Sequence, residues 1–166
     1  MIAERIRTVK NEIPLGVTLV AVSKTKPASD IQTAFNAGHR IFGENKVQEL
    51  CTKQAELSSE IDWHFIGHLQ SNKVKQIAPF VGLIHSVDSL KLLKEIDKQA
   101  KKNERVIHCL LQFHIAQEES KFGLNLDQAQ AILSNHEFIE MKNISIAGVM
   151  GMATFTPNQE QVQEED

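Results

Sequence analysis

The residue of this sequence best placed to take part in a chemical reaction is Lys24, which follows the apolar stretch of residues 18–23. Side chains two positions apart share a face of a strand, so Lys24 should lie in line with Val20 and Val22. A lysine enclosed by strand ends loses hydration, which favours its neutral amine. The neutral amine attacks aldehydes to form an imine. The alternatives are that Lys24 reaches solvent or forms a structural ion pair with Glu44.

Further candidate residues follow other apolar stretches of the chain. Asn45 could hold a ligand hydroxyl or cap the next helix. His114 could lie against a flat ligand ring or be a satisfied core histidine. His64 is more simply explained as a strand histidine that bonds to a backbone carbonyl, and His68 as a loop histidine. Met150 ends the last apolar stretch.

The sequence shows no spacing typical of a metal site. None of its seven histidines forms an HxxxH or HxxEH pattern, and its two cysteines form no CxxC pair. Cys51 and Cys109 are therefore expected to be reduced, at least half-buried residues. Lys73 and Lys121 could attract an anion, although isolated loop lysines usually face water. No nucleophile–base pair is visible either.

Apolar periodicity predicts strands that alternate with helices. The predicted strands cover residues 18–23, 40–42, 63–66, 82–87, 106–114 and 145–150, and the predicted helices cover residues 2–13, 29–37, 47–60, 72–78, 89–102 and 126–136. Such alternation indicates an α/β fold, either an open doubly wound sheet or most of a (β/α)8 barrel of the TIM type. In both, functional groups gather at the carboxyl ends of the strands.

Several polar residues are suited to cap these helices. Asp88 is predicted to cap the helix of residues 89–102, and Asn125 the helix that follows it. Thr156 and Pro157 predict the start of another helix, with Gln159 completing a capping box.

The length and composition of the chain favour a single domain over residues 1–166. The chain is 42% hydrophobic and carries a formal charge of −3, so it has no basic face for nucleic acid. The lysines at 98, 101 and 102 fit the solvated face of a helix. No apolar run reaches the roughly 20 residues that cross a bilayer, and residues 1–14 lack a signal-peptide core. We expect a cytoplasmic monomer without membrane contact.

Several motifs, taken together and in order, resemble the pyridoxal phosphate homeostasis proteins, single-domain relatives of the alanine racemase N-terminal barrel. These motifs are LVAVSKTKP (19–27), FGENKVQEL (42–50), FIGHLQSNK (65–73), QFHIAQEESKFGL (112–124) and GVMGMA (148–153). The resemblance implies a (β/α)8 barrel in which Lys24 carries pyridoxal 5′-phosphate as an imine. It also implies that Asn45 lies close to the cofactor. His114 stands where many relatives have asparagine, and Met150 completes the expected cofactor site.

The family pattern continues beyond the sixth β/α unit into blocks that hold the cofactor's phosphate. This sequence ends at Asp166 and contains only about six units, so we expect it to be part of a longer polypeptide. The phosphate-binding residues would then lie outside it.

Three functions are compatible with these patterns. The resemblance favours a carrier that buffers the cofactor and delivers it to apo-enzymes without catalytic turnover. The alternative is a pyridoxal phosphate-dependent amino-acid racemase or lyase. In the related racemases a tyrosine from a second domain supplies one base, and this chain has no tyrosine. The third possibility is an interaction module or a barrel enzyme without a cofactor.

Overall fold

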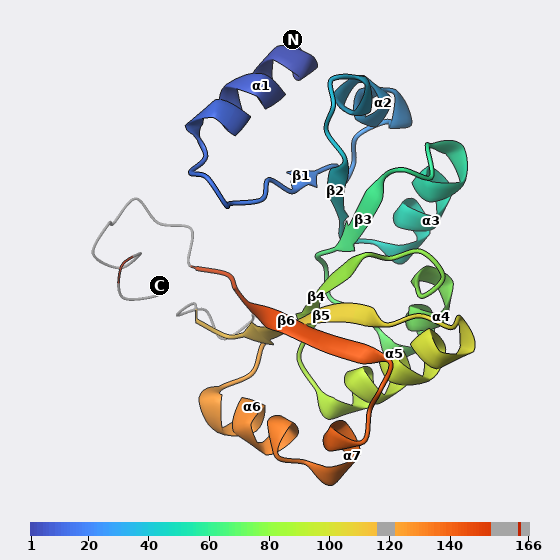
Figure 1. The fold of residues 1–166 in the computed structure, drawn as a ribbon, viewed down its shortest axis with the longest axis vertical. Helices are drawn as coiled ribbons and strands as arrows, with labels where there is room; N and C mark the ends of the chain where they lie inside the picture. The colour runs from blue at the N-terminus through green and yellow to red at the C-terminus, as the bar shows by residue number, and fades with distance from the viewer. Residues whose placement is uncertain (116–121, 154–162, 164–166) are drawn as a thin grey trace.

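The computed structural model describes residues 1–115, 122–153 and 163 of the chain. Its centre is a six-stranded sheet in which every neighbouring pair is parallel (Figure 1). The strands are β1 (Ala21–Val22), β2 (Ile41–Glu44), β3 (Asp62–Phe65), β4 (Leu83–Val87), β5 (Ile107–Phe113) and β6 (Ile144–Gly151). They lie side by side in chain order, β1 to β6.

Helices connect these strands and lie outside the sheet in Figure 1. They are α1 (Ile2–Glu12), α2 (Ala28–Asn36), α3 (Val47–Glu56), η1 (Ser71–Lys73), α4 (Val74–Ile77), α5 (Leu90–Lys102), α6 (Leu126–Leu133) and α7 (His136–Ile139). None of the helices in these ranges is both long and apolar enough to cross a bilayer.

The strand order decides between the two predicted architectures. A doubly wound sheet reverses its order at a switch point, whereas a barrel adds each new strand beside the previous one. The order here runs from β1 to β6 without reversal. The predicted α/β fold is therefore confirmed, with six consecutive units of the barrel type.

Several elements differ from prediction, and two of them show how local contacts outweigh sequence pattern. β1 covers only Ala21–Val22 instead of residues 18–23, since it pairs with β2 on one side alone among the described residues. The helix predicted over 126–136 is divided, because Asn135 caps a new helix, α7. The helix predicted at Pro157 lies outside the described residues.

The predicted caps have opposite outcomes. Asp88 as the cap of α5 is wrong: Ser89 is the N-cap, and its Oγ accepts a hydrogen bond from the Leu92 N–H at 3.2 Å. Asn125 is confirmed as the cap of α6. Its side chain accepts from the Gln128 N–H at 2.8 Å, and the Gln128 side chain accepts from the Asn125 N–H at 2.9 Å. This capping box fixes where α6 begins.

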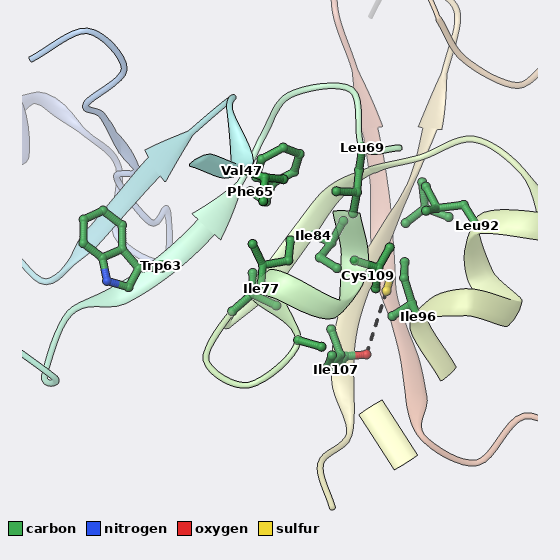
Figure 2. Close-up of a cluster of buried hydrophobic side chains, with 14 of the residues drawn as sticks. Val47, Trp63, Phe65, Leu69, Ile77, Ile84, Leu92, Ile96, Ile107 and Cys109 are labelled. Carbon is green, nitrogen blue, oxygen red and sulfur yellow. Dashed lines mark hydrogen bonds between the residues drawn. The ribbon is translucent and has the colours of Figure 1, made fainter. Parts of the chain in front are cut away.

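The core fills the space between the sheet and its outer helices. Ile84, Ile96 and Ile107 are fully buried and gather around Cys109 in Figure 2. Cys109 is likewise fully buried, as predicted, and burial raises the pKa of its thiol to about 12. Such a thiol is a core residue and not a nucleophile at neutral pH.

A pair of histidines lies on the opposite face of the sheet from this core. His64 Nδ1 and His85 Nε2 are 2.9 Å apart, and Asp62 Oδ2 is 3.5 Å from His64 Nε2. The expected bond from His64 to a backbone carbonyl is therefore replaced by a contact between imidazoles. Burial lowers the pKa of His64, and burial together with the nearby His64 lowers the pKa of His85 to about 4.

This pair predicts a loss of stability in mild acid. The unfolded chain protonates His85 near its ordinary pKa of 6.5, whereas the folded chain resists protonation down to about 4. The stability that depends on neutral His85 is thus present above pH 6.5 and is lost between pH 6.5 and 4. We expect the wild type to lose about 2 kcal/mol more than His85→Gln across this window. Urea unfolding at pH 7.5 and 4.5 measures the difference, and equal losses would contradict the prediction.

Candidate functional site

A pocket of about 340 Å³ opens at the carboxyl ends of the strands. Its lining comes from the ends of β1, β2, β3, β5 and β6: Lys24, Asn45, Ile66, Gly67, His68, Gln112, Phe122, Met150 and Met152. Three predicted site residues, Lys24, Asn45 and Met150, therefore lie in one pocket. The parallel sheet explains this convergence, because its strands all end at the same edge.

Lys24 stands at the rim of this pocket, in a more open position than the sequence predicted. Its side chain is exposed, so the expected shielding from water is wrong for the described structure. The alternative ion pair with Glu44 is also wrong, because Glu44 pairs with Lys53 at 2.7 Å. Among the described residues, β1 has a neighbouring strand on one side, which leaves Lys24 open on the other. Its amine lines the pocket and meets solvent.

Asn45 presents an unused acceptor at the same site. Its Oδ1 is buried and has no hydrogen-bond partner among the described residues. It is not the cap of α3: the N-cap is Lys46, and no side chain caps that helix end. Buried polar atoms are normally bonded, so an unpaired amide in a pocket is suited to a polar ligand group.

Gly67 lets the loop after β3 pass closely over Asn45. A Cβ on Gly67 would lie 2.3 Å from the Asn45 carbonyl oxygen and 2.7 Å from its Cα. We expect Gly67→Ala to displace this backbone and to lower the free energy of unfolding by about 1–3 kcal/mol. Thermal unfolding measures the effect. The control is Gly148→Ala, where the nearest atom is 3.6 Å away; equal stability of the two variants would contradict the prediction.

An aromatic contact that the sequence did not predict closes one side of the pocket. The rings of His68 and Phe122 stack with centroids 4.0 Å apart and an interplanar angle of 13°. Gln112 donates from Nε2 to the Phe122 carbonyl at 3.2 Å, which ties this segment to β5. His68 Nδ1 is also 3.8 Å from Asp88 Oδ2. The sequence places His68 and Phe122 more than fifty positions apart, so no local spacing indicates their contact.

His114, the remaining predicted site residue, is not among the residues that line this pocket. β5 ends at Phe113, and the His114 N–H donates to the Leu124 carbonyl at 3.0 Å. β5 therefore ends one residue before the end of the predicted strand of residues 106–114. From β5, Gln112 lines the pocket. Lys121 lies outside the described residues.

A second lysine near the pocket is buried but not free to react. Lys53 Nζ donates to the Ser23 carbonyl, to Glu44 Oε1 and to Glu49 Oε1, each at 2.7 Å. An ammonium has three N–H groups, so all of them are used. This leaves Lys24 as the pocket amine that can attack an aldehyde.

Comparison with known proteins assigns this chain to a family. The family model described as alanine racemase, N-terminal domain, matches residues 1–165. The chain belongs to this family. The pyridoxal phosphate homeostasis protein of Aquifex aeolicus is 36% identical over 146 residues, which cover 87% of this chain and 63% of that protein. The resemblance inferred from the sequence motifs is thus confirmed.

Solved structures of this family support the same conclusion. PipY of Synechococcus elongatus PCC7942 without PLP has a TM-score of 0.91 at 36% identity, covering 98% of this chain and 76% of that one. PipY with PLP bound has a TM-score of 0.88 at 35% identity, with the same coverage. The chain spans less than two thirds of the length of the first curated relatives that it matches.

Proposed function

We propose that this family member binds pyridoxal 5′-phosphate through the amine of Lys24 and serves to store and deliver it. The observation that carries the proposal is the convergence of Lys24, Asn45 and Met150 on one pocket at the strand ends. PipY, which shares the fold at 35% identity, has been solved with PLP bound. The name of the Aquifex aeolicus relative supports cofactor homeostasis.

The described residues suit the aldehyde end of this cofactor. Lys24 supplies the amine, and the bound aldehyde supplies an electrophilic carbon that exchanges reversibly between amines. The unpaired Oδ1 of Asn45 can accept a hydrogen bond from a ligand group. Met150 and Ile66 add apolar surface to the pocket lining. His114 is proposed as a cofactor contact on the resemblance alone.

An imine carbon can be attacked by a second amine, so the proposed link at Lys24 is reversible and the cofactor can leave again. Delivery to apo-enzymes that require pyridoxal phosphate, a cytoplasmic location and a monomeric state belong to the same proposal. The absence of catalytic turnover is part of it too.

Cofactor transfer tests this function directly. The chain loaded with pyridoxal phosphate is mixed with an apo-enzyme that requires it, and recovery of that enzyme's activity is followed. We expect recovery with the loaded chain and no steady-state conversion when the loaded chain alone meets a panel of amino acids. Sustained racemisation or cleavage of an amino acid, lost in Lys24→Ala, would instead assign an enzyme.

A further inference from the structure

The turn that carries Lys24 is bonded to charged residues that do not line the pocket. Lys53, on α3, extends to this turn and donates to the Ser23 carbonyl at 2.7 Å. Its side chain is 7% exposed, and that of its partner Glu44 is fully buried. The contact joins β1, β2 and α3 in a single polar cluster, which we call the turn clamp: Glu44, Glu49 and Lys53.

The turn clamp binds the residues on both sides of Lys24. On one side, Ser23 Oγ donates to Glu44 Oε1 at 2.6 Å. On the other side, the Thr25 N–H donates to Glu49 Oε1 at 2.7 Å. Lys53 bonds both carboxylates at 2.7 Å and so links the two contacts. The backbone before and after Lys24 is therefore anchored to one ammonium.

Thr25 shows why this turn needs an external anchor. The Lys26 N–H donates to the Ser23 carbonyl at 3.1 Å, so the turn closes with Thr25 at its third position. Thr25 has a φ of 63°, in the left-handed region that glycine or asparagine normally occupies in such turns. A β-branched residue there is strained and persists only where surrounding contacts hold it. The bond from Thr25 to Glu49 is such a contact.

We propose that Glu44, Glu49 and Lys53 are positioning residues that hold the strained turn of residues 23–26 and so aim the Lys24 amine into the pocket. The inference rests on the proposed function for the role of Lys24, but the clamp itself acts on the backbone. Lys53 does not line the pocket around Lys24. Low dielectric around Glu44 and Lys53 strengthens their bonds, and loss of Lys53 would leave buried Glu44 without its cation.

The test compares Lys53→Met and Lys53→Arg with Lys75→Met, an exposed lysine on α4 that serves as the control. The first measurement is hydrogen exchange at the Thr25 amide by NMR, which needs no cofactor. We expect exchange to be about tenfold faster in Lys53→Met, because local opening no longer breaks the Lys53 contacts. Lys53→Arg should restore part of the protection, and Lys75→Met should match the wild type. Unchanged exchange in folded Lys53→Met would overturn the proposal.

The second measurement is the initial rate at which Lys24 captures pyridoxal phosphate, determined by borohydride reduction and mass spectrometry. We expect a fall of about tenfold in Lys53→Met with partial rescue by arginine, because the amine samples orientations away from the pocket. Faster exchange at Thr25 with an unchanged capture rate would also overturn the positioning role. Should Lys53→Met not fold, Glu49→Ala, which removes the carboxylate that accepts from both the Thr25 N–H and Lys53, is measured in the same way.

The two measurements separate this inference from the proposed function. If the wild type captures no cofactor at Lys24, the proposed function fails. Hydrogen exchange at Thr25, together with tryptic cleavage after Lys24, then still decides whether the clamp orders the turn.

Discussion

Replacing Lys24 by alanine is expected to abolish covalent binding of pyridoxal phosphate. Lys24 is the lysine whose side chain lines the pocket at the strand ends, and the buried alternative, Lys53, has all three N–H groups bonded. Without the Lys24 amine, the aldehyde has no nucleophile within this pocket. Dialysis after loading, followed by the visible absorption of the bound cofactor, should show retention in the wild type and background absorption in Lys24→Ala.

Lys26→Ala is the matched control for this prediction. Lys26 lies two residues away in the same turn and is exposed, but it does not line the pocket. Its side chain should therefore be dispensable, and Lys26→Ala should retain the cofactor to within about twofold of the wild type. Equal loss in both variants, or none in either, would show that the position of Lys24 does not decide binding.

Truncation of Ile96 is expected to have the largest effect on stability. Ile96 is fully buried on α5 and faces Cys109 and the neighbouring strands in Figure 2. Ile96→Ala removes apolar contacts and leaves a cavity, at a cost of about 2–5 kcal/mol in the free energy of unfolding. Trp63 is the single tryptophan and is buried in the same core, so its fluorescence reports urea unfolding in every variant.

Lys101→Ala, at the exposed end of the same helix, controls for helix propensity. A surface substitution of this kind is expected to change stability by no more than about 0.5 kcal/mol. If Ile96→Ala unfolded at the same urea concentration as Lys101→Ala, the packing of α5 on the sheet would not be the source of stability described here.

Much of the fold could be predicted because its signals are local. Alternating strands and helices show in the apolar periodicity, and Asn125 with Gln128 forms a capping box within four residues. The carboxyl ends of the strands then follow from topology alone. That reasoning correctly brought Lys24, Asn45 and Met150 together, although it could not assign their roles.

The parts that sequence analysis missed depend on contacts between distant segments. Whether Asp88 or Ser89 caps α5 depends on the backbone angle at a single residue. The stack of His68 on Phe122 joins loops after β3 and β5. The exposure of Lys24 depends on which strands lie beside β1, and among the described residues only β2 does. Glu49 and Lys53 have a visible helical spacing, but only the structure shows that they anchor the turn of Lys24.

These contacts suggest that two groups of residues at the strand ends have different roles. The pocket residues face the ligand, whereas the turn clamp of Glu44, Glu49 and Lys53 lies behind the reacting lysine. The bond to Lys53 lowers the pKa of Glu49, which keeps the anchor of Thr25 charged at neutral pH. In the proposed carrier, the turn clamp thus holds the backbone on both sides of Lys24.

Chemical fixation of the cofactor tests the central claim most directly. The chain is incubated with pyridoxal phosphate, reduced with borohydride and digested, and the modified lysine is identified by mass spectrometry. The account predicts a single modified site, Lys24. Modification chiefly at Lys26, Lys53 or Lys121, or no modification under conditions where the chain is folded, would contradict it.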